Sequence, residues 1–446
     1  MSLEEPGAAT LAADREQADR STIRKAIYAG SVGNFVEQFD YGLYGYMAPI
    51  MASSFFPSSD AAASVLSTYA VLAIAVIVRP LGGTLVGRWG DRVGRRKALL
   101  WTIVMMGIST AAIGLFPTYE RIGFLAPVLL ILARTFQGVV SGGEYVGAVA
   151  FIVEWAHPRE RAYYASYASN SCFLGILGGV AAAAAVSAAF DPAELASWGW
   201  RLPFLAALPL SLVGLWLRNR AAETPEFVRE TEGGAHVLER PVRSALREQW
   251  RPILVFCGAS TMLAILSYTW VTYYPEYLTS ELHMSRWQAL ASNMISVAVL
   301  MPLLPLAGKL SDRIGRKPML LCGAVMIIGL VPLAFAVGER GTFTAATLGQ
   351  LVYIVPEFFL TGIVTTCAAE LFATRTRFTA SAVAYNSSFS VFMGITPFLA
   401  ALLVDQFGTI YAVWGYLAAA AVLALVVISL FMRETYDSDL ASDKYA

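Results

Sequence analysis

Long, continuous apolar runs alternate with short polar segments along almost the whole chain. A helix needs about 20 apolar residues to cross the hydrocarbon core of a bilayer. Only helices and closed barrels span a membrane, because lipid offers no partners to backbone polar groups. Barrel strands would alternate apolar and polar positions over about ten residues, which these runs do not do. The pattern therefore predicts twelve spanning helices, at residues 26–54, 63–87, 98–116, 122–155, 163–189, 199–218, 252–279, 287–308, 318–337, 342–371, 378–404 and 409–432.

The composition fits a chain that is embedded in a lipid bilayer. Hydrophobic residues make up 57% of the 446 residues and charged residues 14%, whereas soluble domains carry about 25% charged residues. These values exclude a soluble domain and a disordered chain. The 32 basic and 32 acidic residues cancel, so there is no basic excess to attract nucleic acid.

No motif in the sequence indicates catalysis. The four cysteines are isolated from one another, and their spacing fits neither a metal site nor a redox pair. The sequence also contains no nucleotide-binding loop, metal-ligand cluster or nucleophile–histidine arrangement. We therefore expect no enzymatic activity and no bound metal or cofactor.

Basic residues are unevenly distributed between the two sides of the predicted spans. Twenty-six of the 32 lie in segments on one side and four on the other, and Arg79 and Arg134 fall within spans. Lys and Arg are enriched in cytoplasmic loops, so both termini should be cytoplasmic. The predicted organisation is a tail at 1–25, a six-helix half at 26–218, a central cytoplasmic loop at 219–251, a second six-helix half at 252–432 and a tail at 433–446.

The chain contains an internal repeat. Residues 87–97 read GRWGDRVGRRK and residues 308–317 read GKLSDRIGRK, which places Asp91 and Asp312 at equivalent positions. A second pair of segments, EWAHPRER at 154–161 and ELFATRTR at 370–377, repeats at a similar offset. The repeats predict two six-helix halves of the same orientation, with a substrate site between them near the middle of the membrane.

These repeated loops resemble the signature of the major facilitator superfamily. Further segments are similar to those of its metabolite:proton symporter family: GNFVEQFDYGLYG at 33–45, RPLGG at 79–83, RTFQGVVSGGE at 134–144, GWRLPFL at 199–205 and ETPEF at 223–227. Members of that family carry organic acids, shikimate, proline, betaine and 2-oxoglutarate. The form Glu37-Gln38-Phe39-Asp40 resembles that of citrate and tricarboxylate carriers. The resemblance implies a monomeric, multi-pass carrier in the bacterial inner membrane that takes small molecules together with protons.

Few ionisable side chains lie inside the predicted spans, and such residues usually mark a transport pathway. They are Glu37, Asp40, Arg79, Arg134, Glu144 and Glu357. We expect Glu37, Asp40, Arg134 and Glu144 to take part in proton coupling. The alternative is that the carboxylates form structural ion pairs with Arg79 or Arg134. Arg79 is also a candidate ligand for an anionic substrate, since a guanidinium holds a carboxylate by two parallel hydrogen bonds.

The second half offers aromatic and amide side chains instead of charges. Hydroxyl, amide and aromatic groups can enclose the uncharged part of a small solute. An aromatic belt or hydrogen bonds between helices would explain the same residues. The expected substrate-binding residues, over both halves, are Tyr41, Tyr44, Arg79, Gln137, Tyr273, Tyr277, Tyr353, Glu357, Tyr385 and Asn386.

The repeated charged motifs are candidates for gating. Each Asp could face a helix N-terminus, where negative charge is stabilised, or pair with an arginine across the two halves. The family resemblance implies that such networks lock the cytoplasmic side when the carrier faces outward. The expected gating residues are Asp91, Arg92, Arg95, Glu154, Arg161, Asp312, Arg313, Arg316, Glu370 and Arg377.

The leading prediction is a secondary transporter that imports a small organic acid, such as a di- or tricarboxylate, with protons by alternating access. Two alternatives keep the same fold. One is efflux of a drug or biosynthetic product by proton antiport. The other is uptake of a zwitterion such as betaine or proline.

Overall fold

The structure is a computed structural model that describes residues 20–58, 61–224, 228, 249–373 and 377–436. The predicted N-terminal tail up to residue 19, most of the predicted central loop and the C-terminal tail after residue 436 lie outside the described residues. Over the described ranges the chain is built from helices joined by short connections and contains no strand.

The N-terminal half consists of six membrane-length segments and a few short helices. The long segments are α2 (Arg20–Phe55), α3 (Ala61–Val93), α4 (Arg95–Leu115), the consecutive helices α6 (Leu125–Ser141) and α7 (Glu144–Trp155), α8 (Arg161–Ala189) and α10 (Arg201–Asn219). The short helices include α5 (Tyr119–Ile122) and α9 (Pro192–Glu194). A break at Gly142 and Gly143 divides the predicted fourth helix into α6 and α7.

The C-terminal half repeats the plan with two irregular segments. It comprises α13 (Trp250–Tyr268), η3 (Thr269–Tyr273), α14 (Tyr274–Ser280), α15 (Arg286–Ile314), α16 (Arg316–Gly338), α17 (Phe343–Glu370), α18 (Arg377–Tyr385), η5 (Asn386–Ser390), α19 (Val391–Phe407) and α20 (Tyr411–Phe431). The segments η3 and η5 are wide, π-helical turns inside the seventh and eleventh spans. Such turns often occur at functional sites because they redirect neighbouring side chains.

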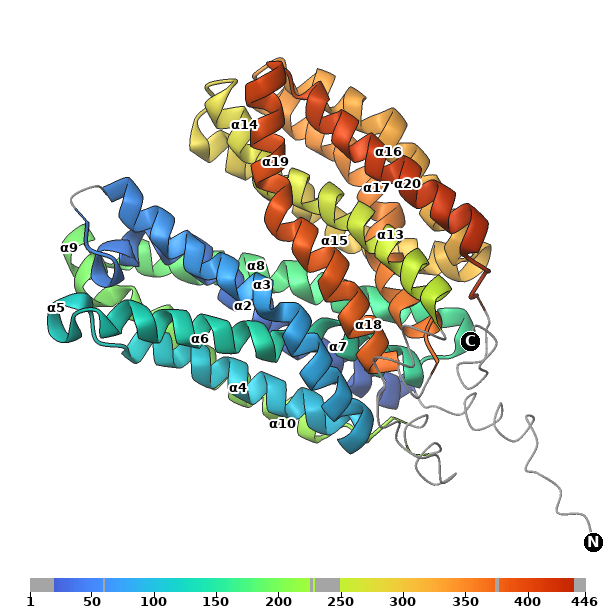
Figure 1. The fold of residues 1–446 in the computed structure, drawn as a ribbon, viewed down its shortest axis with the longest axis horizontal. Helices are drawn as coiled ribbons and strands as arrows, with labels where there is room; N and C mark the ends of the chain where they lie inside the picture. The colour runs from blue at the N-terminus through green and yellow to red at the C-terminus, as the bar shows by residue number, and fades with distance from the viewer. Residues whose placement is uncertain (1–19, 59–60, 225–227, 229–248, 374–376, 437–446) are drawn as a thin grey trace, which may run out of the picture.

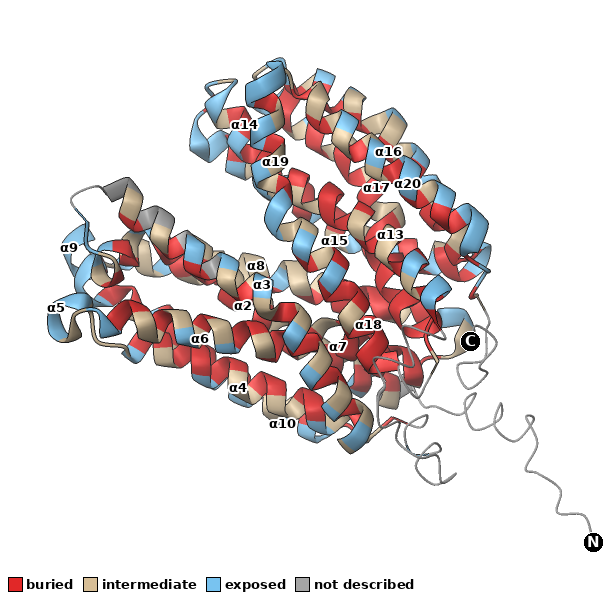
Figure 2. Cartoon of the chain, in the orientation of Figure 1, coloured by how far each residue is buried: buried red, intermediate tan, exposed pale blue. Residues whose placement is uncertain are grey.

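The surface of the bundles suits lipid. Ten of the described helical segments are long and apolar enough to cross a membrane; α2 and α3, at 36 and 33 residues, complete the twelve. Large apolar side chains such as Ile77, Phe124, Phe398 and Leu430 are more than two-thirds exposed on the outside of the molecule. Buried residues lie mainly between the helices of each bundle (Figure 2). An exposed apolar surface of this extent requires a membrane.

The two halves form separate bundles that meet at one end of the molecule (Figure 1). We call this end, where α2 begins and α20 finishes, the closed end. From there the blue-to-green and yellow-to-red bundles diverge toward the opposite end, which we call the open end. The helices α8 and α15, α3 and α18, and α7 and α17 contact one another across the halves.

Glycine allows the helices of the N-terminal half to approach closely. A Cβ at Gly138 of α6 would meet the backbone of Ala75, and one at Gly142 would meet the carbonyl oxygen of Arg79. The small-residue spacing of the fourth span therefore lets α6 pack directly on the backbone of α3, as in other membrane bundles. This packing fixes the part of α3 that carries Arg79.

Candidate transport site

A cavity of about 420 Å³ lies between the two halves, within the range of typical small-molecule sites. The first half contributes residues of α2, α3, α7 and α8, and the second half contributes residues of α13, η3, α17, α18, η5 and α19. The lining comprises Gln38, Tyr41, Gly42, Ala73, Val76, Arg79, Tyr145, Ser169, Cys172, Phe173, Ile176, Leu263, Ser267, Tyr268, Val271, Thr272, Thr361, Thr365, Tyr385, Phe389, Met393, Gly394 and Pro397. Of the predicted substrate-binding residues, Tyr41, Arg79 and Tyr385 line it.

Arg79 is the one lining residue with a formal charge in the part of the chain that the structure describes. Its Nη2 donates to Glu37 Oε1 at 2.7 Å, and both side chains are buried. Nη1 lies 3.5 Å from the hydroxyl of Tyr41, and the guanidinium is 5.8 Å from the Tyr41 ring. Nε of Arg79 has no hydrogen-bond partner among the described residues. The cavity wall thus carries a neutral ion pair, and Nε of Arg79 is buried beneath the cavity surface.

Aromatic rings enclose much of the remaining space. Tyr385 stacks on Phe389 with ring centroids 4.7 Å apart, and Tyr145 lies 5.4 Å from Tyr385. Tyr268 meets Phe389 edge to face at 6.0 Å. Tyr268 directly precedes η3 and Phe389 belongs to η5, so the two π-helical turns help to form this wall. Tyr145, Tyr268 and Phe389 were absent from the predicted site.

Asp40 and Arg134 form a second ion pair that lies away from the cavity. Arg134 Nη1 donates to Asp40 Oδ2, and Thr110 Oγ1 donates to Asp40 Oδ1 at 2.8 Å. Gln137 Nε2 is shared between Asp40 and Thr110. The Arg134 guanidinium lies 3.6 Å from the ring of Tyr44, another predicted substrate ligand. These side chains are buried within the N-terminal bundle and do not line the cavity.

Glu144, a predicted proton-coupling residue, is also buried and does not line the cavity. Arg218 Nη2 and Thr102 Oγ1 both donate to its carboxylate. Arg218 also donates to the carbonyl oxygen of Ala29, 2.6 Å away. Arg218 was not among the predicted intramembrane charges, because it falls at the end of an apolar run. Its side chain extends inward from the last turn of α10.

Three of the predicted aromatic ligands of the C-terminal half, Tyr273, Tyr277 and Tyr353, pack together instead of lining the cavity. Tyr274 lies about 6 Å from both Tyr277 and Tyr353, with ring centroid distances of 6.3 and 6.4 Å. Tyr273 lies beside Tyr277, and the hydroxyl of Tyr353 donates to the carbonyl oxygen of Leu266 at 3.0 Å. This cluster is part of the hydrophobic core of the second half.

Asn386 and Glu357 have distinct surroundings. Asn386 Nδ2 donates across the halves to the carbonyl oxygen of Gly142 at 2.5 Å, at the break between α6 and α7. Glu357 is fully buried in α17, next to the cavity-lining Thr361. Neither side chain lines the cavity itself.

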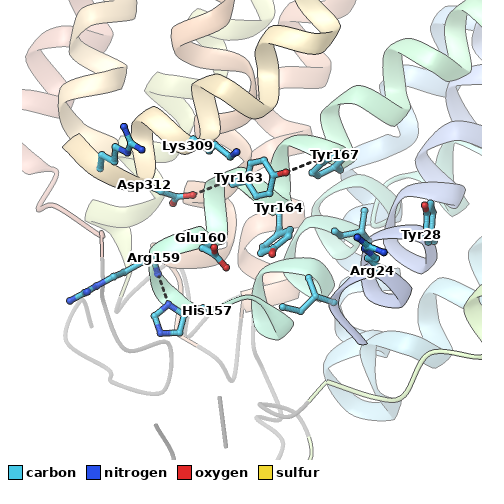
Figure 3. Close-up of a pocket in the computed structure, with 13 residues that line it drawn as sticks. Arg24, Tyr28, His157, Arg159, Glu160, Tyr163, Tyr164, Tyr167, Lys309 and Asp312 are labelled. Atoms are coloured by element: carbon cyan, nitrogen blue, oxygen red, sulfur yellow. Dashed lines mark hydrogen bonds between the residues drawn. The ribbon is translucent and has the colours of Figure 1, made fainter. Parts of the chain in front are cut away.

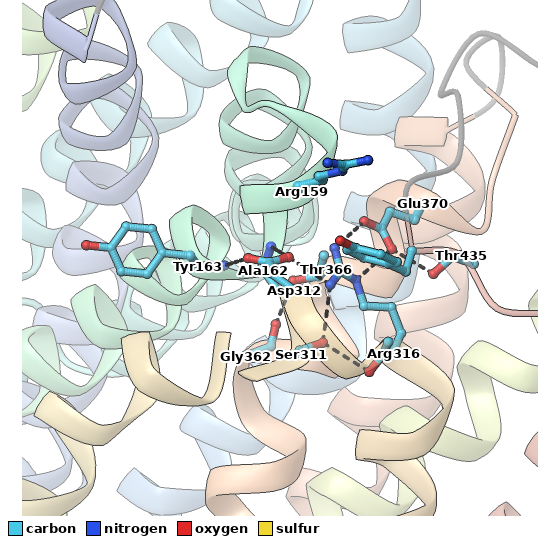
Figure 4. Close-up of polar contacts among 12 residues, drawn as sticks. Arg159, Ala162, Tyr163, Ser311, Asp312, Arg316, Gly362, Thr366, Glu370 and Thr435 are labelled. Atoms are coloured by element: carbon cyan, nitrogen blue, oxygen red, sulfur yellow. Dashed lines mark hydrogen bonds and ion pairs between the residues drawn. The ribbon is translucent and has the colours of Figure 1, made fainter. Parts of the chain in front are cut away.

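The repeated Asp residues each bind the start of a helix in the other half. Asp91, in the last turn of α3, accepts hydrogen bonds from the backbone N–H of Thr379 at 3.0 Å and from its hydroxyl at 2.6 Å. Asp312, in the last turn of α15, accepts from the N–H groups of Ala162 and Tyr163 at 3.1 and 2.8 Å (Figure 4). Each carboxylate therefore satisfies free donors in the first turn of α18 or α8.

Ion pairs surround both caps. Glu154 Oε1 accepts from Arg95 at 3.0 Å and, across the halves, from Arg377 at 2.7 Å. In the matching position Glu370 holds Arg316 at 2.9 Å, and Arg316 also reaches Asp312 at 2.8 Å. Figure 4 shows this second group. Of the other predicted gating residues, Arg161 is buried at the start of α8, and Arg92 and Arg313 are exposed.

Two carboxylates that the sequence analysis did not identify complete the symmetry. Glu223, which follows the sixth span, accepts from the backbone N–H of Arg96 at 3.1 Å. Glu434, which follows the twelfth, accepts from the N–H groups of Arg316 and Lys317 at 2.7 and 3.0 Å. The repeated dipeptide Glu-Thr at 223–224 and 434–435 was the signal that could have identified them.

A larger cavity, of about 1030 Å³, lies at the closed end of the molecule (Figure 3). It lies between α2, the start of α8 and the end of α15, and its wall carries basic and aromatic side chains from both halves. They include Arg24, Arg159, Tyr163, Tyr164, Tyr167, Lys309 and Arg313. Lys309 Nζ lies 4.7 Å from the ring centroid of Tyr163, whose hydroxyl is 2.9 Å from that of Tyr167. Among the described residues no group of His, Cys, Asp or Glu could hold a metal ion.

The sequence model of the Major Facilitator Superfamily matches residues 30–385. The chain belongs to this superfamily. The twelve-segment helical architecture with two similar halves agrees with that membership, so the predicted fold class and the absence of an enzyme family are confirmed.

Curated relatives that match nearly the whole chain are transporters of zwitterions. The glycine betaine/proline/ectoine/pipecolic acid transporter OusA of Dickeya dadantii is 36% identical over 437 residues, which cover 95% of this chain and 85% of the relative. The proline/betaine transporter of Escherichia coli K12 is 35% identical and covers 95% and 86%. The ectoine/proline transporter ProP of Corynebacterium glutamicum is 32% identical and covers 94% and 85%.

Solved structures share the fold at lower identity. The proton:xylose symporter XylE bound to 6-bromo-6-deoxy-D-glucose has a TM-score of 0.77 and 20% identity, with 94% of this chain and 98% of that chain covered. The human organic anion transporter MFSD10 has a TM-score of 0.67 and 14% identity, with 91% and 99% covered.

The comparisons do not confirm the predicted kinship with citrate carriers. The chain is a membrane-embedded, multi-pass transporter of small molecules, as predicted, but these relatives carry proline, betaine and ectoine. The resemblance to citrate carriers rested on Glu37-Gln38-Phe39-Asp40. Gln38 lines the cavity, whereas Asp40 is held by Arg134 inside the bundle.

Proposed function

We propose that the protein is a proton-coupled importer of a small zwitterion of the betaine or proline type. The observation that carries the proposal is the Arg79–Glu37 pair in an aromatic cavity. Arg79 is the charged lining residue, and Glu37 balances its charge at 2.7 Å. A site with balanced charge suits a solute that has no net charge.

The two ends of a zwitterion have complementary partners in the cavity. The guanidinium of Arg79 lines the cavity and can donate to a carboxylate. The rings of Tyr268, Tyr385 and Phe389 offer π faces to an ammonium or methylated ammonium group, which is worth about 0.5–2 kcal/mol for each good contact. The relatives named above are transporters of betaine and proline, and they support the same class of solute.

A di- or tricarboxylate is a poor match for this site. It would bring two or three negative charges to a wall whose described cation is already neutralised. Arg134 and Arg218 cannot compensate, because they are committed to Asp40 and Glu144 inside the N-terminal bundle. Unbalanced charge in a desolvated site costs several kcal/mol.

The arrangement of the halves suits uptake. If the termini are cytoplasmic, as the basic loops predict, the closed end is the cytoplasmic side and the cavity is poised to load from outside. The caps at Asp91 and Asp312 and the Glu154–Arg377 pair then hold the cytoplasmic side shut. Alternating access requires these contacts to break when the halves rock.

Uptake by purified protein in proteoliposomes tests the proposal. An inward proton gradient should drive accumulation of radiolabelled betaine or proline, and a protonophore should abolish it. Citrate and 2-oxoglutarate should neither accumulate nor compete at equal concentration. Accumulation of citrate without accumulation of either zwitterion would overturn the proposed substrate class. Accumulation of betaine that is indifferent to the proton gradient would overturn the coupling.

A further inference from the structure

Four carboxylates of the described chain are buried in the membrane interior, and they differ in whether an arginine pairs with them. Glu37, Asp40 and Glu144 each form an ion pair with an arginine, respectively Arg79, Arg134 and Arg218. Glu357 is as deeply buried as these three, with no exposed surface. It forms no ion pair within the described part of the chain. Proton coupling was predicted for the three paired carboxylates, and Glu357 was predicted as a substrate ligand.

The contacts of Glu357 are hydroxyl groups. Thr361 Oγ1, one turn later on α17, donates to Glu357 Oε2 at 2.6 Å. Oε1 has no hydrogen-bond partner in the described chain, and Ser267 of α13 lies beside the carboxyl group. The titratable side chain that faces it is Tyr353, one turn earlier on the same helix.

Among the described residues, the helices packed around α17 place no unpaired charged side chain beside Glu357. The charged residues of α13, α15, α16 and α8 all lie near the helix ends. The acidic residues of α7, Glu144 and Glu154, are occupied by Arg218 and by Arg95 with Arg377. An ionised carboxylate without a cation in such an interior costs several kcal/mol, and binding a proton removes that cost.

Thr361 and Ser267 also line the transport cavity. The carboxyl group of Glu357 is therefore one hydroxyl away from the space that substrate and water enter. Glu37 is held by the cavity-lining Arg79, whose positive charge stabilises the ionised form of Glu37. Glu357 has no such opposing charge.

We propose that Glu357 is the proton-binding site of the carrier; this assignment rests on the proton-coupled function proposed above. A proton from cavity water forms the O–H bond of Glu357 while the open end is accessible. That bond breaks, and the proton leaves to the other side, when the halves change position and the carboxyl group meets water there. Asp40, Arg134, Glu144 and Arg218 hold the N-terminal bundle together and carry no proton.

Glu357→Gln separates coupling from substrate translocation. The variant should exchange betaine across the membrane in counterflow within about twofold of the wild-type rate, because the amide mimics the neutral acid. Accumulation driven by an inward proton gradient should fall at least about tenfold, since coupling between the two ligands is lost. Glu357→Asp should restore part of the accumulation. Glu276→Gln, which removes an exposed carboxylate of the same half, should behave as wild type.

Infrared difference spectroscopy keeps the assignment testable if the Gln variant does not fold. The wild type should show a carbonyl stretching band of a buried protonated carboxyl group, which persists in Glu276→Gln and moves in Glu357→Asp. A wild type without that band, or full proton-driven accumulation by Glu357→Gln, would overturn the assignment. Accumulation driven by a sodium gradient alone would overturn it too. A wild type that takes up no zwitterion in any gradient would instead refute the proposed function.

Discussion

At the residue scale, the charge of the cavity depends on one pair of side chains from neighbouring helices. Glu37 of α2 and Arg79 of α3 neutralise each other at the wall. Removing one partner of a buried pair leaves the other uncompensated, which costs about 3–5 kcal/mol. A substrate of the right charge can offset part of that cost. The charge of the preferred substrate should therefore depend on this pair.

Glu37→Gln is expected to change the preferred charge of the solute. Arg79 would then give the cavity a net positive charge and favour a monocarboxylate over betaine. The ratio of the two dissociation constants should shift by about tenfold toward the monocarboxylate, equivalent to about 1.4 kcal/mol. Equilibrium binding by isothermal titration to the detergent-solubilised protein measures both constants. An unchanged ratio, with Glu276→Gln as the matched control, would show that the pair does not set selectivity.

The sequence identified the ionisable residues inside the membrane but not their partners. The sequence left open whether Glu37 and Asp40 pair with Arg79 or with Arg134. Spacing along one helix does not show which side chain of a neighbouring helix lies opposite. Arg218 was hidden because its Cα lies at the end of a span while its guanidinium reaches Glu144 in the interior. Long arginine side chains make the position of the backbone a poor guide to the position of the charge.

At the element scale, the turns that link the repeated motifs depend on glycine. Gly94 precedes α4 with φ of 105° and Gly315 precedes α16 with φ of 102°, at equivalent positions of the two halves. Such angles are strained for residues that carry a Cβ. A Cβ at Gly315 would also meet the carboxylate of Glu434, which caps α16.

Gly315→Ala should therefore destabilise the protein by about 1–2 kcal/mol. The matched control is Gly329→Ala in the interior of α16, where a Cβ would meet nothing within 4 Å. That change should be neutral or stabilising by up to about 1 kcal/mol, since alanine favours helix. Thermal unfolding of both variants in detergent gives the comparison. Equal midpoints for Gly315→Ala and the wild type would contradict the requirement for glycine.

Most helix boundaries could be predicted from the apolar runs, whereas the irregular turns could not. The twelve predicted spans agree with the observed helices to within a few residues at most ends, although α2 starts six residues before position 26 and α15 continues to Ile314. The π-helical turns η3 and η5 lie inside continuous spans, and hydrophobicity along the sequence does not report how widely a helix is wound. They bring Tyr268 and Phe389 to the cavity, which is why these residues were missed.

At the scale of the whole molecule, the duplicated motifs join the halves reciprocally. Asp91 of the first half caps α18 of the second, and Asp312 of the second caps α8 of the first. Each cap is worth about 1 kcal/mol. The reciprocal pair therefore favours the closed arrangement by an amount large enough to hold it but small enough for substrate binding to overcome.

The double variant Asp91→Ala and Asp312→Ala should shift the equilibrium between closed and separated halves. Loss of about 2 kcal/mol changes the ratio of the two states about thirtyfold. Spin labels at the exposed Tyr28 of α2 and Ile314 of α15 would report the distance across the closed end. The distance distribution should move to longer values, and Asp405→Asn, an exposed change in α19, should leave it unchanged. No shift in the double variant would assign the closure to other contacts.

The fold and the repeat symmetry were accessible from sequence, but the substrate class was not. Net charge in the cavity results from a pair formed between two side chains 42 positions apart, Glu37 and Arg79. A four-residue motif such as Glu37-Gln38-Phe39-Asp40 cannot report that balance, because it does not show which of its carboxylates faces the solute.

The most direct test of proton-coupled zwitterion uptake is transport current from proteoliposomes on a solid-supported membrane. A neutral zwitterion that moves with one proton carries one positive charge per cycle. Betaine added to the wild type at symmetrical pH should therefore produce a positive inward current that Glu357→Gln lacks, and citrate should produce none. A current evoked by citrate together with silence for betaine and proline would contradict both the substrate class and the charge balance of the site.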